Sequence, residues 1–305
     1  MTWGFALAIT ARAEADRSTD YSDTVRVATW DAPALRVGDL ASLRGDGIFE
    51  TVSVIDGQAQ DVSAHLDRLA HSAKQCDLPA PNRGQWHAAV TLAARRCPPG
   101  QCSIRLLLVR EPVGPAAATG WLVATVSADF TQVRQHGITV VTLERGLERT
   151  VAEHAPWLLL NAKTLSYAVN MAAIREARRR GADDAIFISS DGFVMEGPTS
   201  SVIVRLGGQY LTPDPGAGIL RGTTQLRVFN FLAAHGERTR YATISADTLA
   251  DAEAIWLLSS IRLAAAVTAV DGVDVSHDLA MTARLNDYLL RPGGEVSPTT
   301  RSALP

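Results

Sequence analysis

The sequence predicts a mixed α+β fold of two domains, with mixed sheets flanked by helices. Strand-like and helix-like segments alternate along the 305 residues, but without the regular repeat of a doubly wound fold. The polar segment 129–137 lacks strong periodicity and is expected to be an interdomain linker. We therefore expect a smaller α/β domain at 1–128 and a larger domain at 138–305, sizes that a chain of this length supports.

Four segments of the first half are expected to be strands, because each is a short apolar and β-branched run bounded by turn residues. These segments are 1–9, 48–55, 103–109 and 120–128. Helices are expected at 62–77, where apolar residues recur every three or four positions, and around 86–96. The segment 111–119 is rich in proline, glycine and alanine and is expected to be a loop between two strands.

The second half is expected to hold two hairpins among its strands. The expected strands are 138–143, 185–189, 193–195, 202–205, 209–212 and 254–258. The hairpin turns are Ser190-Asp191-Gly192 and Leu206-Gly207-Gly208. Helices are expected at 164–180, ended by Gly181, and at 224–234.

Composition argues against several classes of partner. The net charge is −3 and the isoelectric point is near 6.2, so nothing indicates nucleic acid or an anionic membrane. No apolar run approaches the roughly 20 residues that span a bilayer. Three scattered cysteines argue against a disulfide framework and for the cytoplasm. Cys97 and Cys102 have a metal-like spacing, but no other cysteine or histidine completes a site, so no metal is expected.

Lysine is rare in this chain. Of its 29 lysine and arginine residues, two are lysine and the other 27 are arginine. A lysine amine can lose its proton and form imines, whereas arginine stays protonated. Lys74 lies off the apolar stripe of its helix and is expected to be solvated. Lys163 follows the apolar stretch 157–162, where burial would lower its pKa. Both a catalytic role and a structural salt bridge fit this position.

Four segments, in order, resemble the class IV aminotransferase family, the fold-type IV enzymes of pyridoxal 5′-phosphate (PLP). They are Arg44-Gly45-Asp46-Gly47-Ile48-Phe49-Glu50-Thr51, His65-Leu66-Asp67-Arg68-Leu69, Asn161-Ala162-Lys163-Thr164-Leu165-Ser166-Tyr167 with Glu196-Gly197-Pro198-Thr199-Ser200, and Gly218-Ile219-Leu220-Arg221-Gly222-Thr223-Thr224. The resemblance runs from about Leu40 to Gly272. It implies a fold like that of the D-amino-acid aminotransferases, with PLP bound in the larger domain.

The resemblance also implies roles around the cofactor ring. Lys163 would form a Schiff base with PLP and then move the Cα proton as general base and acid. Glu196 matches the carboxylate at the pyridine nitrogen, where an anion keeps that nitrogen protonated. Tyr167 would hydrogen-bond the phenolic oxygen. Without the surrounding motif, Glu196 would be interpreted as a glutamate in a solvated turn. Tyr167 fits a place in the hydrophobic core as well as it fits a contact with the cofactor.

Five further residues would hold the phosphate group of PLP. Arg68 matches the phosphate-binding arginine, although on a bare amphipathic helix it would fit the surface. Thr223 and Thr224 open a helix, where free N–H groups favour a phosphate and where they could also act as caps. Ser259 and Ser260 occupy the second phosphate-contacting turn of the family.

Two residues are expected on the substrate side. Phe49 stands where the D-amino-acid enzymes place a tyrosine, and Arg105 stands where some members hold a substrate-handling Tyr-x-Arg or a lysine. Arg105 alternates with Leu106 in an apolar strand, so it points into either a site or a buried ion pair. The substrates implied are an amine or amino acid and a keto acid.

The cofactor residues do not distinguish a transaminase from 4-amino-4-deoxychorismate lyase. Overall similarity favours the lyase-like sequences. However, the loop 111–117 has no cation to hold a dicarboxylate, and Glu50 matches the aminotransferase pattern. The Arg-x-His clamp of the D-amino-acid enzymes is also missing, which favours an amine or a relatively apolar amino compound. We expect transamination, with the lyase as the alternative and a non-catalytic binding module as a third hypothesis. The resemblance implies a homodimer in which a neighbouring loop completes each site.

Overall fold

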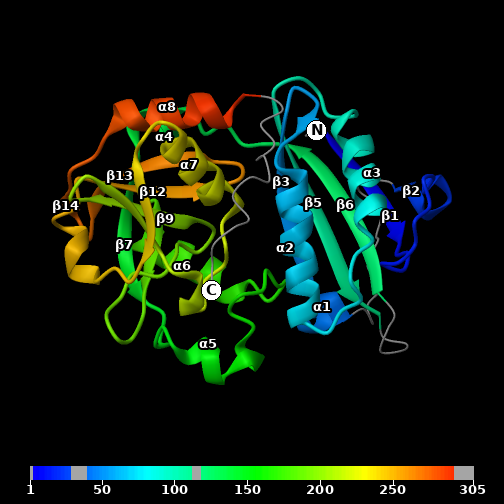
Figure 1. Ribbon diagram of the computed structural model, residues 1–305, viewed down its shortest axis with the longest axis horizontal. Helices are drawn as coiled ribbons and strands as arrows, with labels where there is room; N and C mark the ends of the chain where they lie inside the picture. Colours follow the sequence, from blue (N-terminus) through cyan, green and yellow to red (C-terminus); the bar gives the residue numbers. More distant parts are fainter. Residues whose placement is uncertain (1–2, 29–39, 112–117, 292–305) are drawn as a thin grey trace.

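The computed structural model describes residues 3–28, 40–111 and 118–291. Figure 1 shows two lobes, one built on the strands of the first half of the chain and one on those of the second half. Each lobe holds a sheet with its own helices, which confirms the mixed α+β class. Across these residues, no helix combines the length and the apolar character that crossing a bilayer requires.

The first sheet has six strands in the order β2-β1-β6-β5-β3-β4, and every neighbouring pair is antiparallel. Its strands are β1 (Gly4–Thr10), β2 (Val25–Ala28), β3 (Gly47–Ile55), β4 (Gln58–Ala59), β5 (Gln101–Arg110) and β6 (Ala118–Val126). The helical segments beside it are η1 (Ser22–Thr24), α1 (Leu40–Arg44), α2 (Val62–Gln75) and α3 (Arg83–Ala94).

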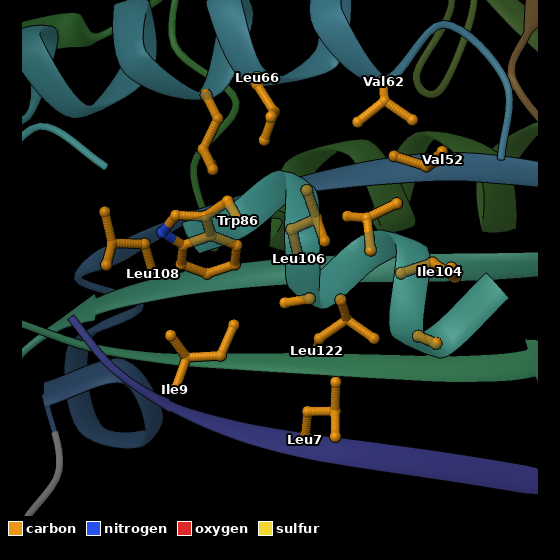
Figure 2. Close-up of a cluster of buried hydrophobic side chains, with 14 of the residues drawn as sticks. Leu7, Ile9, Val52, Val62, Leu66, Trp86, Ile104, Leu106, Leu108 and Leu122 are labelled. Carbon is orange, nitrogen blue, oxygen red and sulfur yellow. The ribbon is translucent and has the colours of Figure 1, made fainter. Parts of the chain in front are cut away.

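One hydrophobic core joins this sheet to α2 and α3. Alternate residues of β5, such as Ile104 and Leu106, are fully buried, as the two-residue period of a strand requires. Figure 2 shows Trp86 of α3 among the side chains of the strands, with Leu66 of α2 above them. The indole of Trp86 is fully buried, so it supplies the largest apolar surface of this core.

The second sheet has eight strands in the order β11-β10-β9-β12-β13-β7-β8, with β14 paired to β13. Its strands are β7 (Ile138–Glu144), β8 (Asp184–Ile188), β9 (Ser201–Leu206), β10 (Gln209–Pro213), β11 (Arg238–Ala242), β12 (Ala254–Ser259), β13 (Leu263–Val270) and β14 (Val273–Asp274). The sheet is mixed: β13, β7 and β8 run parallel, as do β10 and β11, and the other pairs are antiparallel.

Both faces of the second sheet are buried. Ile255 and Leu257 of β12 pack into one hydrophobic cluster, and Trp256 packs into another on the opposite face. This explains why the strand is a continuous apolar run without alternation. The helical segments of this half are α4 (Thr131–His136), α5 (Val151–His154), η2 (Pro156–Leu158), α6 (Ala168–Arg179), η3 (Pro215–Ala217), α7 (Thr223–Ala234), η4 (Ala246–Leu249) and α8 (Leu279–Leu289).

The structure corrects two expectations about the elements. The helix expected from 164 begins at Ala168 instead, because the backbone just before it pairs with β3. The segment 193–195 forms bridges to two other segments but no named strand. The expected linker 129–137 contains the short helix α4, and the domain division there stays a prediction. Of the expected loop 111–119, residues 112–117 lie outside the described residues.

Candidate active site

The segment around Lys163 is held against the first sheet by backbone hydrogen bonds. The N–H of Phe49 donates to the carbonyl of Lys163 at 2.9 Å, and the N–H of Leu165 donates to the carbonyl of Gly47 at 2.8 Å. A Cβ on Gly47 would lie 2.8 Å from the side chain of Val109 and 2.9 Å from that of Leu165, so a larger residue would force these side chains to move. The motif Arg44-to-Thr51 therefore brings the first sheet against the Lys163 segment.

The Lys163 amine lies half-buried between two aromatic rings. Its Nζ is 4.6 Å from the ring centre of Phe49 and 5.7 Å from that of Tyr167. Burial and the positive charge of Arg68 lower the pKa of Lys163 to about 8, although Glu50 and Glu196 oppose the shift. A neutral, nucleophilic amine is therefore accessible near physiological pH.

Glu196 supplies a carboxylate close enough to Lys163 to influence its charge. The backbone N–H of Leu220 donates to Oε2 of Glu196 at 3.2 Å. Burial raises the pKa of Glu196 to about 7, and the bond from Leu220 and the charge of Lys163 offset only part of that shift. This carboxylate can therefore hold either charge state near neutrality, and its anionic form suits a cationic N–H partner.

The hydroxyl of Tyr167 points to the turn that follows Glu196. It donates to the carbonyl of Pro198 at 2.9 Å, and the amide of Asn170 donates to the same oxygen at 2.6 Å. Burial, followed by the charge of Glu196, raises the pKa of Tyr167 to about 12, so its hydroxyl keeps its proton and remains a donor.

Arg68 projects from α2 toward the N-terminus of α7. Its Nε and Nη2 donate to the two carboxylate oxygens of Glu50 at 2.6 and 2.7 Å, and its Nη1 donates to the carbonyl of Arg221 at 2.8 Å. Since each terminal nitrogen carries two hydrogens, one N–H on each is left over for an anion.

The other four predicted phosphate residues lie in the second half of the chain, two at the start of helix α7 and two where strand β12 ends. Helix α7 begins at Thr223, and its N-cap Gly222 offers no side-chain oxygen to the first N–H groups. Thr223 and Thr224 are therefore not serving as the N-cap residue, and the helix N-terminus can receive an anion. Ser259 is the last residue of β12, and Ser260 begins the turn to β13.

All ten predicted residues line one cavity of about 1250 Å³. They are Phe49, Arg68, Arg105, Lys163, Tyr167, Glu196, Thr223, Thr224, Ser259 and Ser260. The cavity draws its walls from both sheets and from α4, α6 and α7. It is large enough for a cofactor together with a small substrate.

The structure decides between the two alternatives for Arg105. Its side chain is exposed on the cavity wall, whereas the neighbouring Leu106 is fully buried in the core. In the described part of the chain, no carboxylate forms an ion pair with Arg105. The buried ion pair is thus excluded there, and Arg105 faces the site.

Sequence reasoning missed the environment of Glu50. This carboxylate is fully buried and contacts both Arg68 and the ring of His65. Its signal was a charged residue inside the apolar strand 48–55, which needs buried partners. Arg145 was also missed: its guanidinium lies on the cavity wall, 4.6 Å from the ring centre of Phe187. An arginine after a strand gives no comparable signal.

The residues of the cavity fit PLP chemically. A nucleophilic amine at Lys163, a titratable carboxylate at Glu196 and a phenol donor at Tyr167 match the aldehyde, the ring nitrogen and the phenolic oxygen of the cofactor. The unused N–H groups of Arg68 and the start of α7 match its phosphate. Within the same described residues, no cluster of three histidine, cysteine or acidic side chains could hold a metal ion.

Comparison with known proteins gives a consistent result. The model of the family "Amino-transferase class IV" matches residues 47–270. A bifunctional aminodeoxychorismate lyase / D-amino acid transaminase from Mycobacterium tuberculosis is 43% identical over 251 residues, which cover 79% of this chain and 87% of that protein.

Similar solved structures indicate the same family. A fold IV transaminase from Curtobacterium pusillum has a TM-score of 0.89 and 48% identity, covering 94% of this chain and 99% of its own. A hypothetical aminotransferase from M. tuberculosis, 38% identical over 93% of this chain and 98% of its own, matches in its PLP-bound form with a TM-score of 0.84. Its form with α-ketoglutarate and PMP has a TM-score of 0.85. The chain belongs to the class IV aminotransferase family and is a PLP-dependent enzyme.

Proposed function

We propose that this enzyme is a transaminase that moves an amino group between an amine or amino acid and a keto acid. The observation that carries the proposal is the Lys163 amine, with a pKa lowered to about 8, in one cavity with Glu196. A lysine in that state can take up and return a proton at the substrate Cα. The transaminase from C. pusillum, at 48% identity, supports the same reaction.

The ring-end residues have complementary tasks. PLP, when bound, supplies an electron sink for the negative charge that develops at the substrate Cα. Glu196 would face the pyridine nitrogen, and a cationic N–H there would lower the pKa of Glu196 from about 7 and keep it charged. Tyr167 keeps its proton and would donate to the phenolic oxygen once its hydroxyl turns from the carbonyl of Pro198.

The phosphate end would hold the cofactor in place. Arg68 offers two unused N–H groups, and α7 offers its first backbone N–H groups at Thr223 and Thr224. The hydroxyls of Ser259 and Ser260 line the same cavity and would add donors.

The substrate side combines apolar walls with one exposed cation. Phe49, Leu107 and Phe130 line the cavity, and Arg105 lies on its wall. We infer that the apolar walls receive a hydrophobic amine or amino compound. The guanidinium of Arg105 would bind a carboxylate, such as that of the keto acid.

A second candidate function is 4-amino-4-deoxychorismate lyase, which releases pyruvate and 4-aminobenzoate. It is supported by the relative from M. tuberculosis, whose name gives both lyase and D-amino acid transaminase. Both reactions begin by removing a proton beside the cofactor, so the residues above serve either one.

The test mixes the purified yellow enzyme with single amines or amino acids of each hand and no keto acid. Conversion of the visible cofactor band by one donor class would support transamination and identify the class. If no donor converts the band and aminodeoxychorismate yields pyruvate, the lyase is the correct assignment.

We also propose that the enzyme is a cytoplasmic homodimer. Its three cysteines are free, which suits a reducing compartment. Trp157, Val169 and Met171 are 74%, 59% and 43% exposed, and Trp157 and Met171 line the cavity mouth. A second copy covering them would shield apolar surface and enclose the site. Sedimentation should give twice the mass of one chain, and a monomer at micromolar concentration would contradict the dimer.

A further inference from the structure

A buried polar cluster lies behind the phosphate end of the cavity. Glu50, on β3, is 0% exposed and accepts hydrogen bonds from two residues of α2. Arg68 donates to both of its oxygens, at 2.6 and 2.7 Å, and His65 Nδ1 lies 2.7 Å from Oε2. The side chains of His65 and Arg68 are 3% and 11% exposed, so water competes little for these bonds.

Both partners of Glu50 also reach across to the other half of the molecule. Nη1 of Arg68 donates to the carbonyl of Arg221 at 2.8 Å. Nε2 of His65 lies 3.4 Å from the hydroxyl oxygen of Thr223, the first residue of α7. One carboxylate on the first sheet therefore holds two side chains that contact the loop leading into α7.

The protonation pattern follows from these contacts. Burial opposes the charged form of Glu50, but the adjacent Arg68 and His65 outweigh it and hold its pKa well below the usual range. An ionised carboxylate only accepts, so Nδ1 of His65 carries the hydrogen. With Nδ1 held by Glu50, the ring of His65 is fixed in orientation, and its Nε2 meets the hydroxyl of Thr223 from one defined direction.

We propose that Glu50 is a positioning residue for the phosphate group of the cofactor, aiming the guanidinium of Arg68 and, through His65, the hydroxyl of Thr223. This inference rests on the proposed cofactor site. Glu50 itself does not line the cavity, whereas Arg68 and Thr223 do. Both branches start on α2 and reach Arg221 and Thr223 at the start of α7, so phosphate binding also depends on how these two helices meet.

A purely structural ion pair would have a different consequence. If Glu50 only stabilised the fold, its loss would weaken every ligand of the site equally. If it aims donors at the phosphate, its loss weakens PLP and spares pyridoxal, which has the same ring but no phosphate. The ratio of the two dissociation constants therefore separates positioning from stability.

The experiment measures both dissociation constants, by absorbance, on cofactor-stripped full-length protein. In Glu50→Gln, we expect the dissociation constant for PLP to rise about tenfold or more. The constant for pyridoxal should stay within about twofold of the wild-type value. The matched control is Glu176→Gln, which removes a carboxylate paired with two arginines on the exposed face of α6, outside the cavity wall.

Equal weakening of PLP and pyridoxal in Glu50→Gln would overturn the inference, as would unchanged binding of both. If Glu50→Gln does not fold by circular dichroism, His65→Gln serves instead, because it leaves the bonds between Glu50 and Arg68 in place. That variant should also weaken PLP selectively, by a smaller factor, and equal weakening of both ligands there would refute the Thr223 branch. Failure of the proposed function is distinct: the wild-type protein would then bind neither ligand.

Discussion

Two acidic side chains, Glu50 and Glu196, serve different ends of the same cavity and differ in what faces them. Glu50 lies between a guanidinium and an imidazole, and its pKa is held well below the usual range by these partners. Glu196 receives one backbone N–H, from Leu220, and burial raises its pKa to about 7. Glu50 is fully buried and Glu196 is half-buried, so burial opposes the charged form of both, and the difference comes from their partners.

The comparison shows how one fold supplies both a fixed and a variable charge. Glu50 stays an anion at every physiological pH and can hold other groups in place. The charge of Glu196 depends on a cationic partner, which the ring of the bound cofactor would provide. Both carboxylates affect Lys163. Each raises its pKa, but burial and the charge of Arg68 have the larger effect and lower it.

The largest expected effect comes from removing the group that both carboxylates influence. Lys163→Ala should lower turnover by about a thousandfold or more, because Lys163 is the one amine among the described residues that line the cavity. The visible band of the attached cofactor should disappear in its absorbance spectrum. Lys74→Arg, at an exposed position of α2, should keep both properties. Normal turnover in Lys163→Ala would contradict the assignment.

Glu50→Gln tests the fixed charge through stability. Removing one partner of a buried ion pair should lower the free energy of unfolding by about 3–5 kcal/mol near pH 7. Because the pKa of Glu50 is lowered by folding, its stabilisation is present above about pH 4.5, the unfolded value, and is lost as the pH falls further. Urea titrations should therefore show the two proteins converging in acid. A constant difference down to pH 3 would contradict a pKa of Glu50 that is lowered by folding.

Glu196→Gln should show the opposite dependence in the cofactor-free protein. Folding raises the pKa of Glu196 from 4.5 to about 7, so its protonated form stabilises the fold at low pH. That contribution is lost as the pH rises from 4.5 through 7. Relative to wild type, the variant should gain on the order of 3 kcal/mol between pH 4 and pH 8. Parallel urea titration curves would show that Glu196 is not a titrating buried acid.

The same variant should slow the chemistry of the loaded enzyme. Glu196→Gln should bind PLP, but turnover should fall roughly 10- to 100-fold, because a neutral amide no longer holds a proton on the ring nitrogen. Steady-state rates at saturating substrate measure the loss. Wild-type turnover would mean that Glu196 does not face the pyridine nitrogen.

The smallest expected effect concerns Arg105, for which the described residues supply no carboxylate partner. Whereas Arg68 is paired with Glu50, Arg105 is exposed on the cavity wall. Arg105→Leu should raise the KM for a keto acid roughly tenfold, while the KM for an amine without a carboxylate changes little. Equal changes for both substrates would indicate a general loss of packing.

Much of this site could be predicted because its residues stand in contiguous motifs. Lys163, Glu196 and Arg68 each lie in a recognisable segment, and the structure brings all three to one cavity. The apolar strand 254–258 and the helix at 224–234 were likewise clear from local patterns, and they correspond to β12 and α7.

What could not be predicted depends on contacts between distant segments. The start of α6 at Ala168 is set by the pairing of Thr164 with Ile48, which local helix propensity does not include. The cluster of Glu50 likewise joins a strand to a helix that begins twelve residues later, and then to Thr223. A charged residue in an apolar strand indicates that partners exist, but not which ones.

The central claim is that the cofactor is attached to Lys163. The chain has two lysines, so reduction of the yellow enzyme with borohydride, followed by digestion and mass spectrometry, gives a direct answer. We expect the added mass of a reduced phosphopyridoxyl group on the peptide that contains Lys163, with none on the peptide that contains Lys74. The modification on Lys74, or on neither lysine, would contradict it.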